Sequence, residues 1–579
     1  MINSGPINSG PINGIAGGTV TPPDYVVSGT AYVWRLRLLV DGVDRTAQLT
    51  GSVDVDREEG SAAVAGFSLH LGSGPVVPTD WVGLPVSIDY LWTEAGIQYS
   101  ARRFTGYLGQ PKWDPTSRIL SCECSDNLQQ RIEAMTVAEI DALTPGYWTE
   151  DAFEPVTGRS HWDYAQERMS TVPASLDCDV YGVPRVSSWM PGAPALVFGA
   201  GTTLYESIEV QLAEMTRVTN RVELEAGYRY ARLREFRQEF SWGTPEGDFC
   251  TWRLANHELP TVDMFISAAS AGGLTPVSAL FTVLPPTAAD PCGTGAPWIN
   301  NEPDLVLSGG VTAARRWAQT VTETYRMTVR TSTGVPPAAV VYRSGQSFAV
   351  ESPDTDLWPD SLVPLVWAIN VGSVITREPV QRLLPGDRDS EPRRTGFLQA
   401  ELHMARTQIL GDHRQNSVSW SVPAPMAIAA DLFMCLEVQD QGVHATGKCR
   451  RIVDSFDMGS GEAVTTLIIA VMRGPAAAST PLTVPARLGA ATAPDPSPGP
   501  GLGAAAPTQL GGRYTSGAYD DTLSGFSGNY VPTQDLSLEV FPRRLEFVAA
   551  EIPAEDTDEA AFAGDFEYVI GIPNDTLEM

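Results

Sequence analysis

Alternating apolar and polar residues dominate the first 125 positions of the chain and predict β-strands. From Tyr32 to Val40 every second residue is apolar, and the residues between include two arginines. The same two-residue period recurs around Phe67 and around Ile88. These segments predict a compact antiparallel β-domain at 31–125, which is a size that folds alone.

The segment from Phe104 to Asp126 predicts a β-hairpin that leads into a helix. Asp-Pro-Thr-Ser at 114–117 is a turn signal, because proline presets φ and the small polar residues bond to the local backbone. Asp126 can cap the short helix that follows. In the second strand the two faces carry different residues, Leu120, Cys122 and Cys124 on one and Ser121, Glu123 and Ser125 on the other.

Helix signals appear after this hairpin. Thr136 to Glu139 forms a capping box, and Ser160 to Met169 predicts a second short helix. Another capping box, from Thr203 to Glu206, precedes apolar residues at helical spacing. We expect the clearest helix of the chain there, covering a sheet.

Strand patterns return after residue 218. They include Val222–Tyr230 and Val321–Val329, in which apolar and polar residues again alternate. Segments 449–456 and 464–472 predict a closing pair of strands. The second of these is apolar on both faces, which predicts a central position in its sheet.

Length and composition indicate a multidomain, mainly β protein of the β-dominated α+β class. The chain has 579 residues, more than one core supports, and contains 53 glycines and 45 prolines. Residues 475–530 are rich in Pro, Gly and Ala and predict a linker without a core. The predicted plan is an extended arm at 1–30, a first β-domain at 31–125, a mixed insertion with helices at 126–217, a second β-domain from 218–242 and 315–474, an insertion subdomain at 243–314, the linker at 475–530 and an acidic attachment segment at 531–579.

The two ends of the chain leave alternatives open. The N-terminal arm repeats Ile-Asn-Ser-Gly-Pro, and its glycines and prolines exclude a helix. The arm is either disordered or extended along a neighbouring subunit, in which case Ile2, Ile7 and Ile12 are candidate interface residues. The acidic end, 531–579, is either an attachment segment for a partner or a solvated tail.

The net charge of −30 argues against a general nucleic-acid binder, because contact with phosphates requires a basic surface. It suits a wall past which DNA slides, since like charges repel, and it equally suits simple solubility. No apolar run reaches the roughly 18 residues that span a membrane, and no secretory signal is visible. We therefore expect that the chain does not insert stably into a membrane. We expect it to be assembled in a cytoplasm.

Candidate chemistry is sparse. The pair His257-Glu258 lacks the second histidine of a zinc-protease motif, and no phosphate loop or nucleophile elbow is present. The cysteines do not form a disulfide framework. Cys178, Cys250 and Cys292 could contribute to an iron–sulfur site, and Cys250 could pair with Cys292, although the spacing matches no ferredoxin-type run. We expect no catalytic, metal or cofactor-binding residues.

One local cluster of charge contrasts with the acidic background. It consists of Arg217, Arg221, Arg229, Arg232, Arg234 and Arg237. Arginine makes bidentate contacts with carboxylates, so a subunit interface with an acidic neighbour is one use, and a DNA or membrane patch is another. The remaining alternative is a solvated strand face, because glutamates alternate with these arginines.

Three segments together resemble a known family. The run Trp-Arg-Leu-Arg-Leu-Leu-Val-Asp-Gly-Val-Asp-Arg-Thr-Ala-Gln-Leu at 34–49, Asp-Arg-Glu-Glu-Gly at 56–60 and the 104–126 hairpin resemble the first domain of phage baseplate hub proteins. Segment 452–471 resembles the closing strands of their second, tube-like domain. The Ile-Asn-Ser-Gly-Pro arm is similar to N-termini of tail proteins of long-tailed phages.

The resemblance implies a virion protein of the tail tip or baseplate. It implies two tail-tube-like antiparallel β-barrel or sandwich domains per chain, and a homotrimeric ring that continues the tail tube and passes DNA at ejection. The implied partners are the distal tail or tube protein, the tape-measure protein and central tip or fibre proteins. The implied role is structural and non-enzymatic.

Two other functions stay open at this point. One is a tail-associated cell-wall hydrolase. The other is a receptor-binding module in which the Trp- and Tyr-bearing region 126–314 grips a host glycan or pilus.

Overall fold

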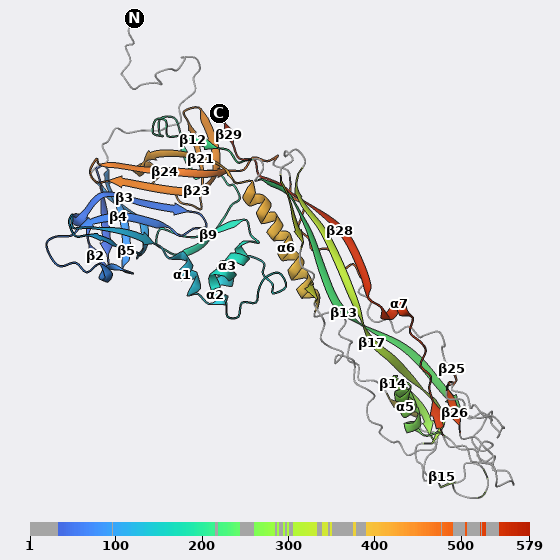
Figure 1. Ribbon diagram of the computed structural model, residues 1–579. Coiled ribbons are helices and arrows are strands. Elements are labelled where there is room, and N and C mark those ends of the chain that lie inside the picture. The colour runs from blue at the N-terminus through green and yellow to red at the C-terminus, as the bar shows by residue number, and fades with distance from the viewer. Residues whose placement is uncertain are drawn as a thin grey trace.

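The computed structural model shows a β-sheet body from which a long, narrow arm extends to one side (Figure 1). Strands far outnumber helices, which confirms the predicted β-dominated class. The structure describes residues 33–94, 97–214, 218–243, 260–283, 287–288, 293, 295, 298–299, 305–332, 339–344, 348–349, 374–377, 390–475, 478–489, 504–505, 522, 524–527 and 544–579.

The largest sheet has 15 strands and combines segments from distant parts of the chain. Its N-terminal half consists of β1 (Val33–Val40), β2 (Val43–Asp44), β3 (Leu49–Glu58), β4 (Val64–His70), β5 (Pro85–Glu94), β6 (Ile97–Leu108), β7 (Lys112–Asp114) and β8 (Ile119–Ser125). The inward residues of these strands, such as Leu38, Phe67 and Ile88, form one core. The alternation predicted for 31–125 is therefore confirmed.

The hairpin predicted at 104–126 forms as expected. The Asp114 carboxylate accepts hydrogen bonds from the Thr116 N–H (2.8 Å) and the Ser117 hydroxyl (2.6 Å), which closes the turn between β7 and β8. Asp126 accepts from the Leu128 N–H at 3.0 Å, at the start of α1 (Leu128–Glu133). The two faces of β8 are as predicted: Leu120, Cys122 and Cys124 are buried, and Ser121 and Glu123 are exposed.

The C-terminal half of the same sheet surrounds a second core. It consists of β21 (Asn416–Pro423), β22 (Cys435–Asp440), β23 (Val443–Asp457) and β24 (Glu462–Val471), with short strands β11 (Leu196–Phe198), β12 (Glu209–Gln211) and β29 (Leu577–Glu578). Strand β24 lies between β21 and β23, which confirms its predicted central position. Strand β23 pairs antiparallel with β3 and so joins the two halves.

The sheet curls until its first strand reaches the turn after β23. Trp34 in β1 donates its indole N–H to the Gly461 carbonyl at 3.0 Å and packs on Phe456, with ring centroids 5.8 Å apart. The path of paired strands among the described residues still has two free ends, β12 and β2. The described strands therefore form a curled open sheet, which departs from the barrel form expected for the two β-domains.

Three short helices pack beside the body, α1, α2 (Val137–Leu143) and α3 (His161–Met169), together with the hairpin of β9 (Ala174–Cys178) and β10 (Pro184–Ser188). The capping box at Thr136 and the Ser160 cap both form as predicted. The helix predicted after Thr203 is wrong. The Thr203 hydroxyl binds Asp440 at 2.7 Å instead of capping a helix, Glu206 has a positive φ of 57°, and strand β12 follows.

The arm is built on two long antiparallel strands, β13 (Thr219–Gly243) and β17 (Val306–Thr331). A strand of 25 residues spans about 80 Å. Residues 306–314 of the predicted insertion at 243–314 therefore lie in the far part of β17. Further elements of the arm are α5 (Val262–Ala271), β14 (Thr275–Val283), β15 (Thr287–Ala288), β16 (Trp298–Ile299), β18 (Ala339–Ser344), β19 (Phe348–Ala349), β20 (Val374–Arg377), β25 (Ala504–Ala505), β26 (Gly525–Ser527), β27 (Arg544–Glu546) and α7 (Ala554–Thr557).

The longest helix of the structure, α6 (Ser390–Asp412), was absent from the sequence-based prediction. It lies along the body-proximal part of the arm, where Phe397, Leu402 and Ile409 pack into the core under β13 and β17 (Figure 1). Leu398, Leu402, Ala405 and Ile409 of the same core recur at spacings of four, three and four residues, so a helical signal was present in the sequence. It lay within a segment that we assigned to a β-domain.

The chain after residue 475 contributes more to the fold than its composition suggests. Strand β28 (Ala560–Ile570) pairs in parallel with β17, and β29 pairs with β23. Leu482, Val484 and Leu488 pack against the same core as α6. Part of the predicted linker and much of the predicted acidic attachment segment therefore belong to the chain's own core. The predicted second β-domain is also divided, because β13 and β17 build the arm while 416–471 belongs to the body.

Candidate functional site

One broad face of the main sheet carries small and polar side chains across both halves of the body. We call it the polar face. Cross-strand pairing places its residues on one side, because residues that oppose each other in a sheet point the same way. Its polar and small members are Asp54, Asp56 and Glu58 from β3, Gly66 and Ser68 from β4, Ser121, Glu123 and Ser125 from β8, Arg451 and Ser455 from β23, Thr466 from β24, and Ser417, Ser419 and Ser421 from β21. Four apolar residues share the face, Val64 from β4, Val453 from β23, and Val464 and Ile468 from β24.

Its rows run straight across the seam between β3 and β23. Asp54 opposes Ser455 on one side and Gly66 on the other, and Gly66 in turn opposes Glu123. The Ser455 hydroxyl donates to Asp54 at 2.7 Å, and the hydroxyls of Ser421 and Thr466 lie 2.8 Å apart. Hydroxyls and carboxylates thus satisfy one another within the face.

Carboxylates outnumber cations on the polar face. Arg451 neutralises Asp56 through its two hydrogen bonds. Glu123 forms a long ion pair with Lys112, with 3.4 Å between Nζ and Oε1, and both side chains are 74% exposed. Such an exposed pair contributes little and is screened by salt. The face therefore offers a phosphate chain few cationic side chains and a net negative potential.

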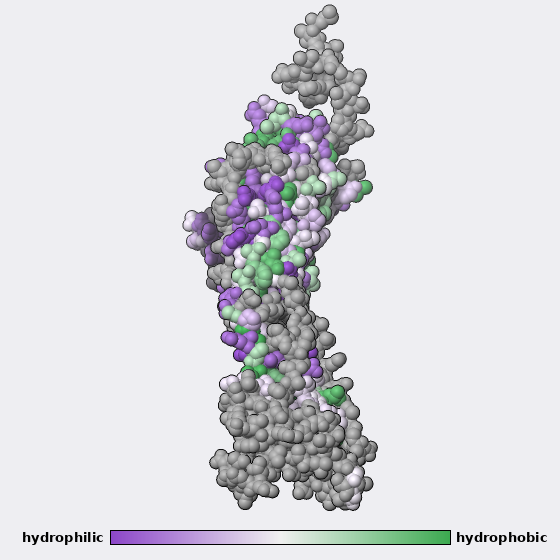
Figure 2. Space-filling view, turned by 90° about the vertical axis from the view of Figure 1, so that its right-hand side faces the viewer, coloured by the Kyte–Doolittle hydropathy of each residue, from purple (hydrophilic) through white to green (hydrophobic). Residues whose placement is uncertain are grey.

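A groove of about 270 Å³ marks the β12 end of the polar face, lined by Glu209, Ser417, Ile468 and Arg451 among others. Its walls mix both signs of charge with hydroxyls and one apolar residue. Figure 2 shows that hydrophilic residues cover much of the body on the side turned toward the arm, with smaller apolar patches between them.

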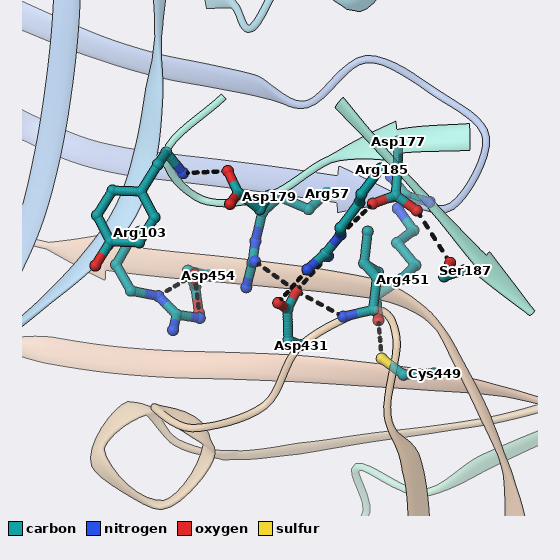
Figure 3. A network of polar contacts seen from close by, with 12 residues as sticks. Arg57, Arg103, Asp177, Asp179, Arg185, Ser187, Asp431, Cys449, Arg451 and Asp454 are labelled. Carbon is teal, nitrogen blue, oxygen red and sulfur yellow. Dashed lines mark hydrogen bonds and ion pairs between the residues drawn. The ribbon is translucent and has the colours of Figure 1, made fainter. Parts of the chain in front are cut away.

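A buried network of charges lies beneath the seam and fixes the two halves together (Figure 3). Arg103 in β6 donates two hydrogen bonds to Asp454 in β23, and the Thr465 hydroxyl donates a third at 2.6 Å. Arg185 in β10 donates two bonds to Asp431, at 2.7 and 2.8 Å. Breaking such buried pairs is costly, so the network holds β3, β6 and β23 in one register.

Arg57 stands at the centre of this network and is 1% exposed. It donates to Asp431 at 3.3 Å. Burial lowers the pKa of the Arg57 guanidinium, and the neighbouring Arg103 lowers it further. Burial alone would raise the pKa of Asp431, but the hydrogen bonds from Arg185 and the charge of Arg57 bring it below its ordinary value. Asp431 thus accepts hydrogen bonds from two arginines of different segments, Arg57 in β3 and Arg185 in β10.

The candidate interface residues predicted from the sequence are only partly described. Ile2, Ile7, Ile12 and Arg217 lie outside the described residues, as do the side chains of Arg232 and Arg234. Arg221 pairs with Glu223 at 2.5 Å, and Arg229 lies 3.6 Å from Glu559. Arg237 lies further along β13. The acidic partners of Arg221 and Arg229 come from this chain, as in the alternative of a solvated strand face.

The cysteines that the structure describes are thiols without a disulfide. Burial raises the pKa of Cys122 to about 12 and raises that of Cys178 as well. Cys250 and Cys292 lie outside the described residues. Within the described part of the chain, no group of His, Cys, Asp and Glu side chains is placed to hold a metal ion, and no helix is long and apolar enough to cross a membrane.

Sequence reasoning had found only the β8 part of the polar face. Its β3 and β21 parts alternate just as visibly, with acids at every second position of 54–58 and serines at every second position of 417–421. The missing information was which strands become neighbours. The buried Asp454 and the partly buried Asp431 carried no local signal.

The chain was compared with known proteins. No protein-family model matches it, and no curated protein matches it. Among solved structures it is similar to a tail protein from Neisseria meningitidis MC58 (9% identity, TM-score 0.37, 76% of this chain and 96% of that one). It is also similar to the prophage MuSo2 tail protein from Shewanella oneidensis (8%, 0.36, 76% and 97%) and to a Francisella PdpA–VgrG complex (7%, 0.31, 76% and 58%).

TM-scores and identities this low do not establish a shared function.

Proposed function

We propose that the protein is a structural hub subunit at the distal end of a phage tail. Three copies form a ring that continues the tail tube, and DNA passes through its lumen during ejection. The observation that carries this proposal is the polar face, which runs without interruption from β8 across the β3–β23 seam to β21.

The chemistry of that face suits a channel wall. DNA slides past a surface most easily when the surface has no cationic side chains that hold phosphates. Serines, a glycine and carboxylates line the rows, and the arginine at their centre is engaged by Asp56. Because each chain supplies strands from two halves to one sheet, three chains can supply the six-part symmetry of a tube end.

The arm and the ends of the chain are proposed contact sites. The arm projects from the body (Figure 1), which places its tip where tip or fibre proteins could attach. Arg221, Arg229, Arg232, Arg234 and Arg237 lie along β13 and could meet an acidic neighbour. The body would dock on the distal tube protein and hold the end of the tape-measure protein. The role is non-enzymatic.

The oligomeric state tests the ring. Light scattering on the purified chain should show a mass three times the 62.2 kDa of one chain, and electron microscopy should show a ring. Antibody labelling of particles should place the protein at the tail tip. A chain that stays monomeric in the presence of its neighbouring tail proteins would overturn the proposal.

A second measurement separates the hub from a cell-wall hydrolase. The purified full chain should leave peptidoglycan gels intact in zymography. Clearing of the gel by the chain would contradict the non-enzymatic role.

A further inference from the structure

An apolar, mainly aromatic surface lies at the end of the sheet where β1 begins, with Glu94 of β5 at its border. Trp34, Trp92 and Tyr99 oppose one another in a single row across β1, β5 and β6. Ile97 lies two residues before Tyr99 and shares its side of the strand. We call these four residues the aromatic row.

The aromatic row is rigid: Trp34 and Trp92 are partly buried against the core of the body, and Tyr99 and Ile97 are exposed. Trp92 and Tyr99 stack with centroids 5.1 Å apart and planes 19° apart, and the Trp34 indole is held by its hydrogen bond to Gly461. Tyr99 is 41% exposed and Ile97 is 58% exposed. Stacked rings with few rotamers lose little freedom on binding, so such a surface is well prepared for an apolar partner.

An open strand edge borders this row. Strand β5 covers one side of β1, whereas β2 pairs only with Leu39 and Val40 on the other. Along Val33–Arg37 no described strand occupies that second side. An extended segment that inserts its apolar side chains into the row could therefore also bind main-chain groups of β1.

The chain contains a segment of matching chemistry. Its N-terminal repeats offer an isoleucine and a proline every five residues, and the first ionisable side chain of the sequence is Asp24. Copies of a chain with a net charge of −30 repel each other, so contacts between them are least costly where both surfaces are uncharged. Residues 2–13 carry no ionisable side chain, and the four side chains of the aromatic row are uncharged, with Glu94 opposite Ile97 as the charged residue at the border. The 21 residues from Ile12 to Val33 can span about 70 Å, which is enough to reach a neighbour.

We propose that the aromatic row binds an N-terminal Ile-Asn-Ser-Gly-Pro repeat of a second copy of this chain. The inference rests on the proposed ring and names the contact that straps one copy to the next. One isoleucine packs on Tyr99 and Ile97, and the adjacent proline stacks on the indole of Trp92.

A peptide titration tests the surface separately from the ring. The probe is a fluorescent peptide with the sequence of residues 2–13. It is added to a variant of the chain that lacks residues 2–13 and is otherwise complete. Anisotropy should show saturable binding of one peptide per chain. Tyr99→Ala and Ile97→Ser should each weaken it about tenfold, as loss of an interface anchor does. The matched control is Tyr181→Ala, which removes an exposed tyrosine elsewhere and should change nothing.

Cross-linking identifies the source of the arm. One chain carries Ile7→Cys and another carries Ala101→Cys, which lies two residues from Tyr99 in β6 and shares its side of the strand. Oxidation of the mixture should give a disulfide-linked pair that neither variant gives alone. If a double variant diluted into unmodified chain links only within itself, the arm binds its own body and the proposal is wrong. If the unmodified chain forms trimers but the 2–13 peptide does not bind, the proposed strap is wrong and the trimeric hub stands. If the peptide binds but the unmodified chain never forms trimers, the proposed ring is wrong, and so is a strap between its copies.

Discussion

Arg103 and Asp454 lie 351 residues apart in the chain and form a buried ion pair with two hydrogen bonds of 2.8 Å. Their side chains are 2% and 1% exposed. Strand β6, which carries Arg103, belongs to the N-terminal half of the sheet, and β23, which carries Asp454, belongs to the C-terminal half. This ion pair therefore links the two halves of the sheet, and removing it tests how strongly they are held together.

Removing one partner of that pair should destabilise the body strongly. We expect Arg103→Met to lower the free energy of unfolding by about 3–5 kcal/mol, because Asp454 would remain buried without its counter-charge. Urea unfolding of the body, followed by tryptophan fluorescence, measures the change. Lys112→Met is the matched control, since its pair with Glu123 is exposed, and it should cost at most about 1 kcal/mol. Equal costs for the two variants would contradict the seam's role.

Reversing charge on the polar face should create affinity for DNA. Asp54 and Glu123 flank Gly66 in one row, so Asp54→Lys with Glu123→Lys places two cations about 10 Å apart, which is twice the spacing of neighbouring strands. We expect the unmodified chain not to bind duplex DNA at physiological salt and the double variant to bind it with a salt-dependent affinity. Fluorescence anisotropy measures both.

The control for this experiment makes the same change of net charge on the arm. Glu551→Lys with Asp565→Lys alters two exposed residues far from the polar face. If the arm variant binds DNA as well as the face variant does, net charge alone decides the affinity and the face has no special role.

Acid should weaken the contact between α6 and the body. His403 packs against Tyr147, with ring centroids 4.3 Å apart and planes tilted by 43°. Burial lowers the pKa of His403 from an ordinary 6.5 to about 4, and the charge of Arg406 lowers it further. Between these two values the unfolded chain binds more protons than the folded one, so stability falls as the pH falls from 6.5 toward 4. Urea midpoints at pH 7, 6 and 5 should show this decline.

His403→Phe keeps a ring in contact with Tyr147 but cannot titrate. This variant should therefore show a smaller decline of the urea midpoint between pH 7 and 5. His70→Gln changes an exposed histidine and should leave the slope as it is. An unchanged slope in the His403 variant would show that other groups cause the acid sensitivity.

The C-terminal segment 571–579 should lose its packing against the body when a larger side chain replaces Gly474. A Cβ atom on Gly474 would overlap the side chain and carbonyl of Ile572, which is fully buried. We expect Gly474→Ala to cost about 1–3 kcal/mol and to raise hydrogen exchange of residues 571–579. Gly66→Ala is the matched control, because a Cβ there meets nothing within 4 Å. Similar exchange in both variants would argue against a tightly packed segment.

The elements that the sequence predicted well depend on neighbours close in the chain. The 104–126 hairpin follows from its turn residues and from the alternation of β8. The capping box at Thr136 follows from a contact with Glu139, only three residues along the chain. The same local reasoning failed at Thr203. There Asp440, 237 residues away, takes the hydroxyl that a helix cap would have used.

The sequence by itself determined that this chain forms strands, which face of each strand is polar, and that its surface is acidic. Only the tertiary structure decided that β3 pairs with β23, that β13 and β17 form an arm, and that separate polar stripes join into the polar face. The physical reason is that alternation and turn chemistry are local. Strand partners, in contrast, are chosen by apolar faces and buried charges that meet only after distant segments have folded together.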